Sequence, residues 1–147
     1  DKVVVVVEAD GKDKDGVMLA LENLKAPVII AGAISTRVQQ RFAGAEVGDK
    51  DKIETYMENV VMVARESEFS GFMKEGETWT YLQYFKPGKK KEPDKLVYRG
   101  YQLWSINRQD LVKQIEKMMD DAAKTEEKTP EKQTAIDRVK EAFYEGF

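Results

Sequence analysis

The chain has 147 residues, of which 41% are hydrophobic and 35% charged, and its net charge is −3. This length fits one domain with a hydrophobic core, and the acidic balance argues against attraction of the whole molecule to nucleic acid or to an anionic membrane. Cysteine and histidine are both absent, which excludes disulfides, thiol chemistry, cysteine-based metal sites and every histidine-dependent catalytic triad.

The N-terminal part of the chain predicts a strand and then a short helix. Residues 2–9 form the strand, because they contain five consecutive valines with β-branched side chains. An uninterrupted apolar run also predicts burial on both faces, in a central strand or beneath a partner subunit. A polar turn follows, and residues 16–25 have the pattern of a short helix.

The next segment, residues 26–42, fits two interpretations. One is a second strand at 28–31 followed by a helix, and the other is a single helix with Pro27 at its first position, where proline is tolerated. We favour the single helix because apolar residues recur on one stripe at every fourth position: Ile30, Ile34, Val38 and Phe42. Residues 43–50 are predicted to be a loop, and 51–66 a further amphipathic helix.

A connection at 69–76 leads into two aromatic-rich strands, 78–85 and 96–106. Residues 86–95 (KPGKKKEPDK) join them, and their prolines and charges predict an exposed loop rather than a β-ladder. The pair is therefore a long-loop hairpin. Asn107 is a suitable N-cap for the helix that follows.

The C-terminal part of the chain predicts two more helical features. Residues 124–128 form a hydrophilic linker. Thr129 and Pro130 then predict the start of a last helix, with Thr129 as its N-cap and Pro130 as its first residue. The last helix either docks on the domain or reaches a neighbouring subunit. We predict an α+β domain at 1–124, with a small, mainly antiparallel sheet packed against three to four helices, and a helical extension at 125–147.

Both hairpin strands carry apolar side chains on both faces, and such a sheet needs a cover on each side. Aromatic residues are also enriched at stable protein interfaces. The sequence therefore predicts interface or core anchoring by six residues of the hairpin: Trp79, Tyr81, Tyr84, Tyr98, Tyr101 and Trp104.

Two weaker patterns point to other ligands. Lysines in the hairpin loop, flanked by aromatic residues, suggest nucleic-acid contact through cations and stacking, with Lys86, Lys89, Lys90 and Lys91 as the candidates. Asp13, Asp15 and Glu22 match part of a calcium-binding loop, but Gly11 falls at the first ligand position. We interpret that segment as an acidic turn before a helix, and we expect no metal.

The sequence contains neither a glycine-rich phosphate-binding loop nor the nucleophile-elbow motif of hydrolases. The opening segment, from VVVVVEADGKDKDG to ISTRVQQRF, resembles that of phage tail-completion and virion-morphogenesis proteins, and YRGYQLWSI is similar to a later segment of that family. The resemblance implies a small, non-catalytic subunit of a ring at the head–tail junction or tail end of a virion.

We expect a structural or assembly subunit that self-associates or binds other protein subunits, has no cofactor and is not an enzyme. The alternative is a nucleic-acid-associated accessory protein that uses the lysine loop. No apolar run approaches the length of a membrane span, and the absence of cysteine is compatible with a reducing compartment or a virion.

Overall fold

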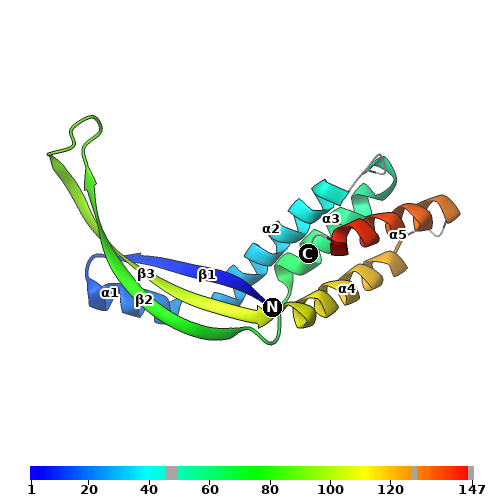
Figure 1. Ribbon diagram of the computed structural model, residues 1–147, viewed down its shortest axis with the longest axis horizontal. Helices are drawn as coiled ribbons and strands as arrows, with labels where there is room; N and C mark the ends of the chain where they lie inside the picture. The colour runs from blue at the N-terminus through cyan, green and yellow to red at the C-terminus, as the bar shows by residue number, and fades with distance from the viewer. Residues whose placement is uncertain (46–49, 127–128, 146–147) are drawn as a thin grey trace. The chain divides into compact units, whose positions relative to one another are not determined.

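The computed structural model describes residues 1–45, 50–126 and 129–145, and it confirms the α+β class with an antiparallel sheet (Figure 1). The elements follow the order β1 (Lys2–Gly11), α1 (Lys14–Asn23), α2 (Ala26–Ala45), α3 (Lys50–Glu66), β2 (Met73–Phe85), β3 (Pro93–Asn107), α4 (Arg108–Lys124) and α5 (Pro130–Glu145). These elements form two compact units, one built on the sheet and one made of helices.

The sheet unit contains residues 2–26 and 72–106. Its strand order is β1-β3-β2, so β3 is central and β1 lies at an edge. The antiparallel ladder between β2 and β3 runs from the pair Met73 and Ser105 to the pair Phe85 and Pro93. The long predicted hairpin is therefore confirmed, with its irregularities at Lys74/Gly76 and Tyr84/Phe85.

The prediction that the valine strand is a central strand is wrong, because β1 lies at an edge of the sheet, whereas burial of its second face beneath a partner subunit stays a prediction. Val3, Val5 and Val7 are buried, whereas Val4 and Val6 are 51% and 50% exposed. Alternate side chains of a strand point to opposite faces, and only one face of this edge strand is covered. An unbroken run of apolar residues is thus compatible with an edge strand that has one buried face and one exposed face.

Helix α1 covers one face of the sheet through Val17 and Leu21, which are both buried. It comes so close to β3 that a Cβ atom added to Gly100 would lie 2.6 Å from Cδ1 of Leu21. Beside this contact, the amide of the buried Gln102 donates a hydrogen bond of 2.8 Å to the Glu77 carboxylate. The glycine in the middle of β3 therefore permits the close packing of α1 on the sheet.

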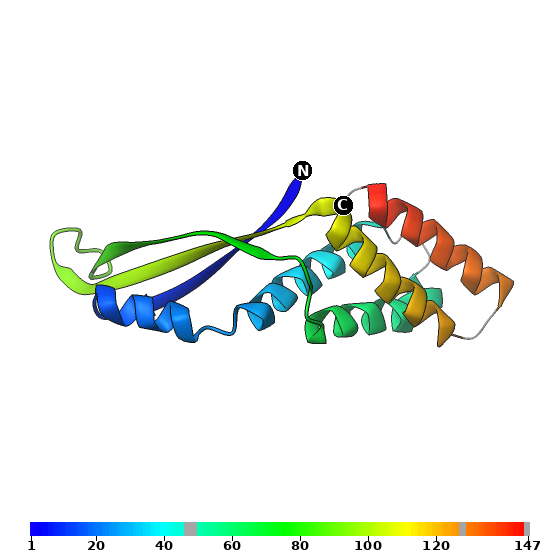
Figure 2. The same ribbon diagram turned by 90° about the horizontal axis from the view of Figure 1, so that it is seen from below.

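The helical unit contains α2 to α5, and α3 packs against both α4 and α5 (Figure 2). Phe42 of α2 contacts two other helices of this unit: its ring centroid lies 6.2 Å from that of Tyr56 in α3 and 5.2 Å from that of Phe143 in α5. The final helix thus docks within this unit. Whether 125–147 folds as a separate extension, as the predicted division at residue 124 implies, stays a prediction.

The single-helix interpretation of residues 26–42 is confirmed, because α2 is continuous and all four residues of its predicted stripe are buried. The predicted caps are also present: Asn107 accepts a hydrogen bond from the Gln109 backbone and Thr129 accepts one from the Lys132 backbone. Tyr56 is an additional, fully buried member of the core.

Three predicted boundaries need correction. Strand β2 begins at Met73, inside the predicted connection 69–76. The polar composition of this segment does not indicate a strand, but the segment pairs with β3 and becomes part of the ladder. Strand β3 begins at Pro93, inside the predicted loop, at a strand start where proline is tolerated. In the predicted loop 43–50, residues 43–45 and 50 are helical, and 46–49 lie outside the described residues, as do 127–128 of the predicted linker.

In the described part of the chain, no single helix is both long and apolar enough to cross a membrane, although α1 and α2 taken together as a bent pair reach that length and composition.

The Tyr56 hydroxyl is buried and has no hydrogen-bond partner among the described residues. We expect Tyr56→Phe to leave the free energy of unfolding unchanged at neutral pH or to raise it by up to about 1 kcal/mol, because it removes a buried polar group without a partner. Denaturant titration of the variant and of Tyr81→Phe, an exposed control, measures the effect. A loss above about 1 kcal/mol would mean that the hydroxyl has a partner.

Burial raises the pKa of Tyr56 above its ordinary value of 10.0. The unfolded chain then loses this proton at a lower pH than the folded protein does. The free energy of unfolding should consequently fall above about pH 10, by up to about 1.4 kcal/mol per pH unit for one proton. Burial raises the pKa of Tyr144 as well, so Tyr56→Phe should reduce the alkaline loss without abolishing it.

Candidate protein-interaction surface

Strands β2 and β3 extend past the rest of the sheet unit as a two-stranded ribbon (Figure 1). The end of β1 is tied to β3 by the ion pair of Asp10 with Arg99, and the start of α1 contacts β2 where the Lys14 ammonium lies 5.3 Å from the Trp79 ring centre. Residues 80–98 lie beyond both contacts, and we call them the hairpin arm. Its two strands remain paired up to Phe85 and Pro93.

The hairpin arm exposes large apolar side chains. Tyr81 is 63% exposed and Phe85 48%, and Tyr84 and Leu96 are also exposed. Within the arm, the rings of Tyr81 and Tyr98 lie 6.1 Å apart. An isolated two-stranded hairpin is only marginally stable in water. An arm of this kind is therefore expected to be stabilised further when a second surface covers it.

The structure divides the six predicted anchoring residues between the two faces of the hairpin. Direct partners in an antiparallel ladder share a face, and the register places Trp79, Tyr81, Tyr98 and Trp104 on the face toward α1 and Tyr84 and Tyr101 on the opposite face. The Trp104 indole donates a 3.2 Å hydrogen bond to the Gln102 side chain. Trp104 is thus half-buried beside Gln102, whereas Tyr81 and Tyr84 are exposed and available to a partner.

The face of the sheet opposite α1, which we call the open face, carries an apolar patch across all three strands. Its members alternate along each strand and are exposed or half-buried: Val4, Val6, Leu82, Val97, Tyr101 and Leu103. For the valines, this exposure fits the second sequence alternative, burial beneath a partner subunit, which stays a prediction. Several exposed apolar side chains on one face are typical of a binding surface.

Two ion pairs lie on the open face among the apolar side chains. The Arg99 guanidinium donates two hydrogen bonds to the Asp10 carboxylate, at 2.7 and 3.1 Å, and lowers the pKa of that carboxyl. At the other end, Lys2 pairs with Glu75 at 2.6 Å and the Ser105 hydroxyl donates to the same carboxylate, so the pKa of Glu75 is lowered too. The first pair ties β1 to β3, the second ties β1 to β2, and the Ser105 hydrogen bond ties β2 to β3.

The lysines of the hairpin loop are only partly available to a ligand. Lys86 and Lys89 both pair with Glu92, at 3.3 and 3.4 Å, whereas the exposed Lys90 and Lys91 have no ion-pair partner among the described residues. Nucleic-acid binding through this loop stays a prediction, with half of its four candidate cations already paired within the loop.

The acidic turn before α1 acts as a helix cap. The Asp13 side chain accepts a 2.6 Å hydrogen bond from the Gly16 backbone, which agrees with the interpretation of this segment as a turn. Among the described residues, no group of three or more acidic side chains gathers in a way that could hold a metal ion.

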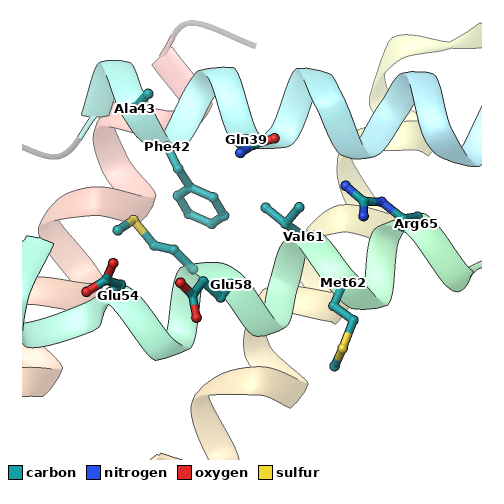
Figure 3. Close-up of a pocket in the computed structure, with 9 residues that line it drawn as sticks. Gln39, Phe42, Ala43, Glu54, Glu58, Val61, Met62 and Arg65 are labelled. Carbon is teal, nitrogen blue, oxygen red and sulfur yellow. The ribbon is translucent and has the colours of Figure 1, made fainter.

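A pocket between α2 and α3 was not predicted from the sequence. Its volume is about 340 Å³, and Figure 3 shows the Phe42 ring projecting from α2 toward α3, with Gln39 also on α2 and with Glu54 and Glu58 on α3. The rest of its lining comes from Ala43, Met57, Val61, Met62 and Arg65. The sequence pattern of neither helix indicates a binding site at these residues. The pocket exists only because α2 and α3 lie side by side.

Comparison of the chain with protein-family models, curated proteins and solved structures found no match.

Proposed function

We propose that this protein is a non-catalytic assembly subunit whose hairpin arm binds a neighbouring protein subunit. The observation that carries the proposal is the exposure of Tyr81, Tyr84, Phe85 and Leu96 on a ribbon that extends beyond α1 and β1. Four large apolar side chains on an unsupported hairpin are unfavourable in water. Their burial against a second subunit removes this cost and supplies the apolar area on which association depends.

Further support comes from the open face and from the composition. The patch around Val4, Val6 and Leu103 offers a second apolar surface on the same unit. A chain without histidine or cysteine lacks the most common catalytic side chains. The resemblance of its opening segment to phage tail-completion and virion-morphogenesis proteins favours a ring-forming subunit of a virion neck or tail.

Sedimentation velocity tests the proposal. We expect the wild-type chain to associate as its concentration rises, and Tyr81→Ser/Phe85→Ser to weaken association at least about tenfold, because central aromatic residues supply much of the binding energy of interfaces. The control is Leu19→Ser, which removes an equally exposed apolar side chain from α1. It should associate as the wild type does.

Two results would contradict the proposal. One is undiminished association of the arm variant, which would place the contact elsewhere on the chain. The other is a wild-type chain that stays monomeric and that also copurifies with no other protein from its native source.

A further inference from the structure

The hairpin loop has the opposite charge to the rest of the chain. Residues 86–95 contain five lysines and two acidic residues, so they carry a net charge of +3, while the whole chain carries −3. The other residues together therefore carry −6. A basic loop at the end of a long arm is attracted to acidic protein surface, and a second copy of this chain supplies such a surface.

The pocket between α2 and α3 has the chemistry to receive this loop. Its apolar part comes from Phe42, Met57 and Val61 (Figure 3). Its α3 side carries the exposed carboxylates of Glu54 and Glu58 and the guanidinium of Arg65, so its charged side chains leave a net negative charge. The two glutamates are four residues apart on one helix, where like charges repel and cost a few tenths of a kcal/mol. Neither has an ion-pair partner in the described parts of the chain.

The arm presents a matching combination of side chains. Phe85 is 48% exposed and immediately precedes the loop. Lys90 and Lys91 are exposed loop lysines that have no ion-pair partner in the part of the chain that the structure describes. A cavity of about 340 Å³ is near the lower end of the range for ligand pockets, roughly 300–1,000 Å³. A single aromatic side chain suits that size better than a large ligand does.

We propose that the end of the hairpin arm of one copy binds the α2–α3 pocket of a second copy, with Phe85 in the apolar part and with Lys90 and Lys91 facing Glu54 and Glu58. This contact rests on the proposed assembly function and names its partner. The arm belongs to the sheet unit and the pocket to the helical unit, so each copy offers one of each. Such head-to-tail contacts close into a ring or continue as a filament.

Reciprocal charge reversal tests the contact by sedimentation velocity. The arm variant is Lys90→Glu/Lys91→Glu and the pocket variant is Glu54→Lys/Glu58→Lys. Each alone should weaken self-association at least about tenfold, because like charges then meet at the interface. An equimolar mixture should recover it: the reversed arm fits the reversed pocket, and the unchanged arm of the pocket variant fits the unchanged pocket of the arm variant.

The matched control is Lys113→Glu/Lys117→Glu, which reverses two exposed lysines of α4 and should associate as the wild type does. Circular dichroism checks that every variant is folded. Added salt should weaken wild-type association, since the contact depends on exposed charges.

The proposal is overturned if either reversed variant associates normally, if the mixture of folded variants fails to recover association, or if the wild-type chain is monomeric. Normal association of the pocket variant, together with loss of association in Tyr81→Ser/Phe85→Ser, would overturn this contact and leave the assembly function in place. The arm would then bind a different surface.

Discussion

Replacement of Phe143 by alanine is expected to lower the free energy of unfolding of the helical unit by about 3–5 kcal/mol. The Phe143 side chain is fully buried in α5, and its ring packs 5.2 Å from the Phe42 ring of α2. The substitution removes a large apolar side chain and leaves a cavity where α2, α3 and α5 meet. It also removes an aromatic pair, worth roughly 0.5–1.5 kcal/mol beyond its buried area.

Two spectroscopic signals separate the units in this experiment. Both tryptophans of the chain, Trp79 and Trp104, belong to the sheet unit, whereas four of the five described helices belong to the helical unit. Denaturant unfolding followed by far-UV circular dichroism should therefore shift strongly in Phe143→Ala. Glu141→Ala, on the exposed side of α5, should stay within about 0.5 kcal/mol of the wild type. A shift of Phe143→Ala as small as that of the control would show that α5 adds little to this core, as expected of a separate extension.

The second large effect is expected for Gly100→Val, which should lower the stability of the sheet unit by about 3 kcal/mol, at the upper end of the usual cost of overpacking. A Cβ atom at this position would meet Cδ1 of Leu21 at 2.6 Å and Cγ1 of Val17 at 3.1 Å. Both side chains are buried between α1 and the sheet, so they have little room to move. Tryptophan fluorescence reports the unfolding of this unit.

Gly76→Val is the matched control, because it places the same side chain on β2, where a Cβ atom would meet nothing within 4 Å. Valine favours extended backbone, so the control should be neutral or slightly stabilising. Equal fluorescence transitions for Gly100→Val and the wild type would contradict the close approach of α1 to β3.

The helices could be predicted because their signals are local. The stripe of Ile30, Ile34, Val38 and Phe42 recurs at the helical period, and α2 is the single helix that this period favours. The cap at Asn107 likewise depends only on residues next to it in the sequence. Local periodicity and capping act within one or two turns, so they hold whatever the rest of the chain does.

The strands were predicted less well because a strand is completed by its neighbours. The segment around Lys74 and Glu75 carries no apolar alternation, yet it pairs with β3 and its Glu75 carboxylate contacts Lys2 of β1. For the same reason the valine run could not indicate its own position in the sheet. Strand order depends on which distant segments pair, and those contacts are not encoded in any one segment.

The sequence identified the aromatic residues of the hairpin as anchors, but which of them pack inside the protein and which stay exposed depends on the fold. Composition singled out Trp104 and Tyr81 equally, and only the fold makes the first half-buried and leaves the second 63% exposed. The sequence by itself determined the helices, their caps, the aromatic hairpin, its basic loop and the absence of histidine and cysteine. Only the tertiary structure decided that β1 is an edge strand with one exposed face and that the hairpin extends beyond α1. It also decided that Phe42, Glu54 and Glu58 line one pocket. Each of these features depends on contacts between segments that lie far apart in the chain.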